Sequence, residues 1–156
     1  MNKRRREVLK TGGGAGVLAW VVAAGLIKPS QALALEWNKA AFETKSVPDT
    51  LKALGANGST ESAEVQITAP DIAENGAVVP ISVDSALART QAIAILIEKN
   101  PNTLSADFEI PSGTDPFIST RVKMAETSNI YALVLADGKY FHAVKEIKVT
   151  IGGCGG

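Results

Sequence analysis

With 156 residues, the chain has room for one domain and a processing segment, and its hydrophobic content of 46% is that of a globular protein. Six of the 16 basic residues but one of the 16 acidic residues lie in 1–34, so residues 35–156 keep ten bases and fifteen acids, a net charge of −5. This acidic part has no cluster of Lys and Arg. It therefore argues against a nucleic-acid partner, because phosphate binding needs such clusters.

The first 34 residues have the features of an export signal. Arg5 and Arg6 stand in the run Arg-Arg-Arg-Glu-Val-Leu-Lys, which matches the twin-arginine pattern. The apolar stretch 12–27 is rich in glycine and too mild for a membrane span. Pro29 and the small-x-small site that ends at Ala34 predict cleavage after Ala34. We expect delivery to the periplasm by the twin-arginine route, with no membrane contact in the mature form; an uncleaved N-terminal anchor is the alternative.

Two short helices are expected in an N-terminal helical segment, residues 35–60. The first covers 36–42 and is amphipathic. The second begins near Ser46, with Pro48 and Asp49 in its first turn and Leu51 and Leu54 on one face. Residues 55–62 are rich in turn formers and predict a linker to a different kind of structure.

From residue 64 onward the apolar residues alternate with polar ones and are largely β-branched, which predicts strands. The expected strands are 64–69, 78–84, 91–98, 105–109, 117–124, 129–136 and 140–151. Asp137-Gly138 predicts a two-residue hairpin before the last strand, in which Ile147, Val149 and Ile151 share one face. The pattern predicts an all-β, immunoglobulin-like antiparallel β-sandwich of about seven strands over 61–151, without an inter-sheet disulfide.

Few residues of the chain suggest catalysis. With one histidine and one cysteine there is no ligand set for zinc or copper, and no cofactor motif follows a strand. His142 has no nucleophile motif to serve, so we interpret it as structural or partner-facing. Arg121 and Lys123 alternate on one strand, which favours a solvated strand face over an anion site. We therefore expect no catalytic residue, metal or cofactor.

The one cysteine, Cys154, lies in the C-terminal sequence Gly-Gly-Cys-Gly-Gly. In an exported protein a lone cysteine cannot close an internal disulfide, so it is either a free thiol or a link between chains. Burial in the core is excluded, because the flanking glycines offer no side chains to pack against it.

Residues 152–156 form a predicted carrier arm. Its glycines are Gly152, Gly153, Gly155 and Gly156. Glycine has no Cβ and moves freely, so the arm should be flexible and thin, and five residues can extend to about 17 Å. No Lys or Arg next to Cys154 promotes ionisation of its thiol, so a partner's active site would have to activate it. These properties are typical of a carrier.

Residues 149–156, Val-Thr-Ile-Gly-Gly-Cys-Gly-Gly, resemble the C-terminus of the SoxY family, the sulfur carriers of periplasmic thiosulfate oxidation. The likeness extends to 67–76, 78–81, 117–124 and the hairpin at 136–138, and so to essentially all of 35–156.

The resemblance implies a covalent carrier of sulfur intermediates, bound through Cys154, and not an enzyme. It implies a heterodimer with a SoxZ-like subunit. A c-type haem enzyme like SoxAX would join thiosulfate oxidatively to Cys154, a hydrolase like SoxB would release sulfate, and a sulfur dehydrogenase-like enzyme would act on the remaining sulfane sulfur.

Three other functions remain open. Gly155-Gly156 would suit a ubiquitin-like carrier that forms a C-terminal thiocarboxylate, but the export signal and the run of strands without a central helix count against it. A thiol oxidoreductase would need a second cysteine. A structural module could use Cys154 only to form a disulfide-linked dimer.

Overall fold

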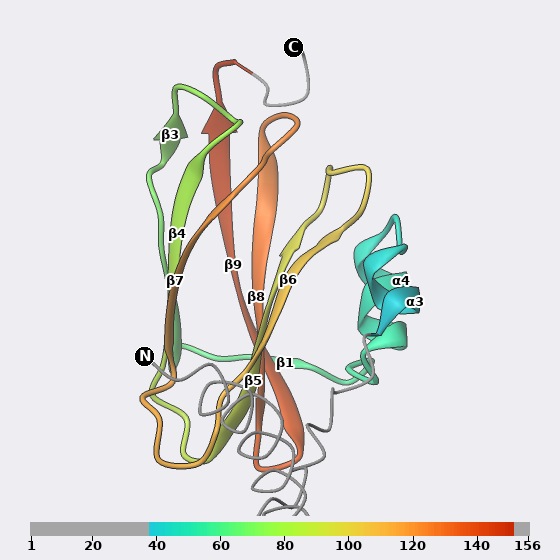
Figure 1. Ribbon diagram of the computed structural model, residues 1–156, viewed down its shortest axis with the longest axis vertical. Coiled ribbons are helices and arrows are strands. Elements are labelled where there is room, and N and C mark those ends of the chain that lie inside the picture. The colour runs from blue at the N-terminus through green and yellow to red at the C-terminus, as the bar shows by residue number, and fades with distance from the viewer. Residues whose placement is uncertain (1–37, 152–156) are drawn as a thin grey trace, which may run out of the picture. The chain divides into compact units, whose positions relative to one another are not determined.

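Two β-sheets packed face to face form the body of the described chain, residues 38–151 of the computed structural model (Figure 1). The larger sheet has six strands in the order β1-β9-β8-β5-β6, with β3 also paired to β9, and the smaller sheet has the order β2-β4-β7. The strands are β1 Thr60–Glu61, β2 Val65–Thr68, β3 Ile72–Ala73, β4 Val79–Ser85, β5 Thr90–Ile97, β6 Leu104–Glu109, β7 Phe117–Val122, β8 Ser128–Ala136 and β9 Lys139–Val149. The predicted all-β sandwich is confirmed, and each of the seven expected strands has a counterpart.

The central strands of the larger sheet are buried on both faces. In β5, Ile93, Ile95 and Ile97 point into the core between the two sheets, whereas Ala94 and Leu96 belong to a second apolar cluster under the helices. Successive side chains of a strand point to opposite faces, so only a nearly continuous apolar run can fill both clusters. Removal of one of these fully buried isoleucine side chains would cost about 2–5 kcal/mol.

The two helices cover the outer face of the larger sheet. They are α3 Lys39–Phe42 and α4 Val47–Ala53. The Ser46 hydroxyl accepts a hydrogen bond from the Asp49 amide at 3.2 Å and caps α4, and Pro48 occupies its first turn, as the sequence predicts. Leu51 and Leu54 pack with Leu133 of β8 in the second cluster. Neither helix of residues 38–151 has the length and apolar character needed to cross a membrane.

A two-residue turn joins β8 to β9. Asp137 and Gly138 have φ values of 50° and 72°, the left-handed conformations that a hairpin turn of this length requires. Strand β9 therefore runs back along β8. The two strands pair from Lys139 opposite Ala136 to Ile147 opposite Ser128.

Two features of β9 differ from the prediction. Its outer edge pairs with the two-residue strands β1 and β3, and both pairings are parallel, so the sandwich is not purely antiparallel. Strand β9 also ends at Val149 and not at Ile151. Ile147 is fully buried as expected, but the side chain of Ile151 is 68% exposed, because the core between the sheets does not extend to it.

Candidate functional site at the root of the C-terminal arm

The predicted carrier arm follows directly on the end of β9, so its geometry depends on Thr150 and Ile151, which we call the arm root. The segment 71–76 runs beside β9 and its extension in parallel, with Ile72 opposite Lys148 and Ala73 opposite Val149. The Thr150 amide donates to the Ala73 carbonyl at 3.1 Å. The chain is thus held by backbone hydrogen bonds beyond the last strand residue.

Two further contacts hold the arm root against the same segment. The Thr150 hydroxyl donates to the Glu74 carbonyl at 2.9 Å. The Gly76 amide donates to the Ile151 carbonyl at 2.8 Å. Thr150 and Ile151 therefore both have partners in 73–76, and Ile151 is the last residue of the chain that the structure describes.

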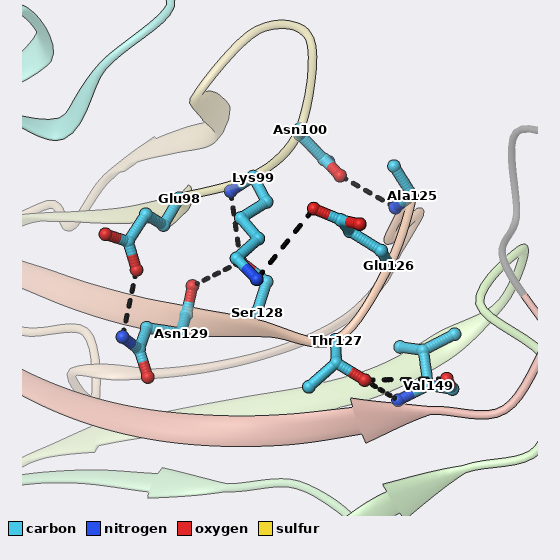
Figure 2. Close-up of polar contacts among 9 residues, drawn as sticks. All are labelled: Glu98, Lys99, Asn100, Ala125, Glu126, Thr127, Ser128, Asn129 and Val149. Carbon is cyan, nitrogen blue, oxygen red and sulfur yellow. Dashed lines mark hydrogen bonds and ion pairs between the residues drawn. The ribbon is translucent and has the colours of Figure 1, made fainter.

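On the β8 side, the end of β9 is held by a single threonine (Figure 2). The Thr127 hydroxyl oxygen accepts from the Val149 amide at 2.9 Å, and the same hydroxyl lies 3.5 Å from the Val149 carbonyl oxygen as a donor. A side chain here takes the place of the strand partner that β8, which begins at Ser128, no longer supplies.

The loops beside Thr127 are joined by polar contacts, and Figure 2 shows those of Asn100 with Ala125 and of Lys99 with Ser128. The Asn100 side chain donates to the Lys123 carbonyl at 2.7 Å and accepts from the Ala125 amide at 2.9 Å. The Lys99 amide donates to the Ser128 hydroxyl at 3.0 Å. The β5–β6 and β7–β8 loops therefore brace one another at the end of the sandwich where β9 finishes (Figure 1).

One ion pair ties the strand β9 to the start of the segment 71–76. The Lys145 ammonium donates to the Ala69 carbonyl at 2.7 Å and to the Asp71 carboxylate at 2.9 Å. This hydrogen bond, together with the positive charge of Lys145, holds the pKa of Asp71 below its usual range. Asp71 is highly exposed, so solvent screens the pair.

Apolar side chains are exposed around the arm root. Ile72 is 58% exposed, Val78 is 55% exposed and Ile151 is 68% exposed. Ile72 belongs to the segment that holds the arm root, Val78 follows that segment by two residues, and Ile151 belongs to the arm root itself. This end of the sandwich therefore has exposed apolar side chains beside the hydrogen bonds that hold the arm root.

Several predicted site residues lie outside the described residues. They are Arg5, Arg6 and Ala34 of the export signal and Gly152, Gly153, Cys154, Gly155 and Gly156 of the arm. The structure therefore places the point from which the arm starts. The assignments of these residues remain predictions.

His142 lies under the helical layer. It is half-buried and lines a small cavity of about 40 Å³ with Leu51, Ser59, Tyr131 and Leu133. Its Nδ1 atom is buried and has no hydrogen-bond partner among the described residues. These mostly apolar surroundings are typical of a histidine with a structural role. Within residues 38–151, no three His, Cys, Asp or Glu side chains come together as metal ligands.

The residues that hold the arm root carry no signal that sequence reasoning could use. Thr127 and Thr150 act on partners 22 and 76 residues away, which a pattern of polarity does not show. Only the family resemblance of 67–76 singled out part of the segment, without indicating its role.

Comparison with known proteins places this geometry in a family. The family model for the sulfur oxidation protein SoxY matches residues 50–154, a segment that includes the position of Cys154. The solved structure of the sulfur carrier protein SoxY from Chlorobium limicola f thiosulfatophilum is 38% identical. It matches with a TM-score of 0.58 over 66% of this chain and 96% of that chain.

A superoxide reductase (neelaredoxin) from Ignicoccus hospitalis is 18% identical and matches with a TM-score of 0.50, over 65% of this chain and 92% of that chain. At this identity, the likeness concerns the fold alone. None of the curated proteins searched matches the chain.

Proposed function

Because this chain belongs to the SoxY family and is a sulfur carrier rather than an enzyme, we propose that the thiol of Cys154 is the group that carries the sulfur. The observation that carries this proposal is the match to the family model, which runs through residue 154 and so takes in the one cysteine of the chain. No other side chain of the sequence offers a thiol.

The proposed chemistry balances with an external electron acceptor. The thiol and thiosulfate lose one proton and two electrons, and the new sulfur–sulfur bond gives a Cys154 S-thiosulfonate. We propose that a c-type haem enzyme like SoxAX takes the electrons. Hydrolysis by an enzyme like SoxB would then cleave the bond to the sulfonate, release sulfate and leave a persulfide for a sulfur dehydrogenase-like enzyme.

The geometry at the end of β9 supports this function in one respect. A carrier has to present its thiol at a defined place on its surface while the thiol still enters other proteins. Contacts to Ala73, Glu74 and Gly76 hold the chain as far as Ile151, so the five following residues can serve as an arm with a fixed origin. Exposed apolar side chains at the same end offer contact area to a docking enzyme.

The proposal includes the location and the partner of the protein. Export by the twin-arginine route, with Arg5 and Arg6 as the signal and cleavage after Ala34, would bring the chain to the periplasm, where thiosulfate is oxidised. A SoxZ-like subunit would complete a heterodimer. The twin-arginine route carries folded proteins, so the two subunits could cross the membrane together.

Intact mass spectrometry tests the carrier group. The protein is purified from cells grown on thiosulfate and measured before and after a reductant. We expect adducts with the mass of thiosulfate or of added sulfur that the reductant removes, on a chain that begins at Leu35. The Cys154→Ser variant should carry none.

Two results would contradict the proposal. A bare wild-type chain under these conditions would leave only a binding module, and a disulfide-linked dimer without sulfur adducts would favour the structural role of Cys154. Adducts that persist in Cys154→Ser would point to another group, such as a C-terminal thiocarboxylate on Gly156.

A further inference from the structure

An open hollow lies between the edge strands of the two sheets. Strand β6 is the last strand of the larger sheet and β7 the last of the smaller sheet, so this side of the sandwich is not closed by backbone pairing. The hollow measures about 270 Å³, and its polar lining comes from Asn100, Ser105, Thr120, Arg121 and Lys123. We call it the β6–β7 hollow.

Two of the residues that line the β6–β7 hollow are cationic, Arg121 and Lys123. Arg121 and Lys123 form no ion pair with the described residues, whereas Lys99 and Lys145 each lie beside a carboxylate. No Asp or Glu lines the hollow. In a part of the chain with a net charge of −5, two unpaired cations at one place create a local preference for anions.

The polar groups around these cations are also available. The side chains of Ser105 and Thr120 make no hydrogen bond to another described residue, so each hydroxyl is available to a molecule that enters the hollow. The Asn100 side chain is already hydrogen-bonded to the Lys123 carbonyl and the Ala125 amide. It therefore fixes the wall of the hollow next to Lys123.

Gly76 links the arm root to Met124, the residue that follows Lys123 of the hollow. The Gly76 amide donates to the Ile151 carbonyl at 2.8 Å, and the Gly76 carbonyl accepts from the Met124 amide at 2.7 Å. Chain segments that share such bonds lie about 4.8 Å apart, so Ile151 and Met124 are separated by roughly 10 Å. Lys123 is the residue before Met124.

The arm is long enough to span the distance from Ile151 to Met124. Cys154 is three residues beyond Ile151, and three residues extend to about 10 Å. A thiosulfonate on the sulfur adds further length, and Lys123 and Arg121 have long side chains that can cover part of the remaining distance.

We propose that the β6–β7 hollow is a docking site for the sulfonate of the chain's own S-thiosulfonate adduct, with Arg121 and Lys123 as the charges that hold it. This inference rests on the proposed function of Cys154. Docking would keep the anionic cargo on the surface of its carrier between enzymes. Both cations are exposed, so the hold is weak and sensitive to salt, as release to a partner enzyme requires.

The test loads the purified protein without any enzyme. Tetrathionate reacts with the Cys154 thiolate, which attacks an inner sulfur atom, forms the disulfide bond of the S-thiosulfonate and expels thiosulfate. Iodoacetamide gives a neutral cap on the same sulfur with loss of iodide. Amide chemical shifts are then compared between the two forms by NMR, after intact mass has confirmed each modification.

We expect the difference between the charged and the neutral form to be largest at Ser105, Thr120, Arg121 and Lys123. It should disappear in Arg121→Gln/Lys123→Gln and persist in Arg121→Lys/Lys123→Arg, which keeps both charges. Lys139→Gln is the matched control, since it removes one exposed cation at the opposite end of β9 and should leave the difference unchanged.

Three results would overturn the inference. They are no difference at the hollow in the loaded wild-type protein, a difference that survives the loss of both cations, and a difference that survives an increase in salt from about 0.01 to about 1 M, where the screening length falls from about 30 to 3 Å. Because tetrathionate needs no partner, such a result leaves the carrier role of Cys154 intact, and failure of enzymatic loading leaves this test unaffected.

Discussion

At the scale of single residues, the arm root depends on two threonine side chains. The Thr127 hydroxyl holds the Val149 amide, and the Thr150 hydroxyl holds the Glu74 carbonyl. Each replaces a backbone partner where a strand has ended, and each acts within two residues of the place where the arm begins. These two side chains therefore help to fix the point where the described chain ends.

Substitution of Thr150 tests this role. In Thr150→Val the hydroxyl is lost while the shape of the side chain is kept, and a hydrogen bond of this kind contributes about 1 kcal/mol. We expect the amide of Gly76, which is bonded to Ile151, to exchange its hydrogen roughly fivefold faster. Thr150→Ser should restore the slow exchange.

Thr68→Val is the control for this experiment. Thr68 is likewise an exposed threonine, but its hydroxyl makes no hydrogen bond with the described residues. If the Gly76 amide exchanges at the wild-type rate in both Thr150→Val and Thr68→Val, the hydroxyl of Thr150 does not hold the arm root.

At the scale of elements, the helical layer is fastened to the larger sheet by a tyrosine. The Tyr140 hydroxyl donates to the Leu54 carbonyl, at the end of α4, at 2.7 Å. Burial, and then the negative charge of Asp107, raise the pKa of Tyr140, so the hydroxyl keeps its proton and remains a donor. The other tyrosine, Tyr131, packs in the same apolar cluster, but its hydroxyl has no partner among the described residues.

The two tyrosines make a matched pair of variants. Tyr140→Phe should lower the free energy of unfolding by about 1 kcal/mol, because it removes the hydrogen bond and leaves the Leu54 carbonyl without its donor. Tyr131→Phe should leave it nearly unchanged. Urea denaturation followed by circular dichroism measures both, and equal effects of the two substitutions would show that the bond does not fasten the helices.

The elements also show what could be predicted from the sequence. Alternation of β-branched residues located the seven longer strands, and Ser46 with Pro48 located α4, because these signals are local. Strands β1 and β3 have two residues each and exist only because β9 lies beside them, so no local pattern predicts them. Cys154 could be identified because it is the one cysteine of the sequence and lies between glycines, whereas the residues that hold the arm root could not.

At the scale of the whole molecule, the end that carries the arm depends on pH through one ion pair. Since Lys145 lowers the pKa of Asp71 in the folded state, this pair stabilises the fold above the ordinary pKa of an aspartate. Its contribution is lost as the pH falls through the lowered folded-state value. Lys145 also donates to the Ala69 carbonyl, a partner that carries no charge.

We therefore expect segment 71–76 to loosen from β9 below about pH 4, before the sandwich unfolds. Hydrogen exchange of the Lys148 amide, which is bonded to the Asp71 carbonyl, should report this as faster exchange relative to amides of β5. Asp71→Asn should show the faster exchange already at neutral pH and no further change in this range. An Asp71→Asn profile that follows the wild type would assign the acid response to other carboxylates.

The parallel pairing of β9 with β1 and β3 also determines how late in folding the arm root becomes fixed. Strand β9 bonds to residues near 60, near 72 and in β8, so its environment is complete only after chain segments distant in sequence have closed, which is slow in β-proteins. Until the segment 71–76 packs against β9, a longer stretch of unfixed chain separates the thiol of Cys154 from the folded part of the sandwich. The effective concentration of the thiol at any fixed point on the surface is then lower. With the proposed role of Cys154, an incompletely folded chain would therefore be a poor carrier even with its cysteine intact.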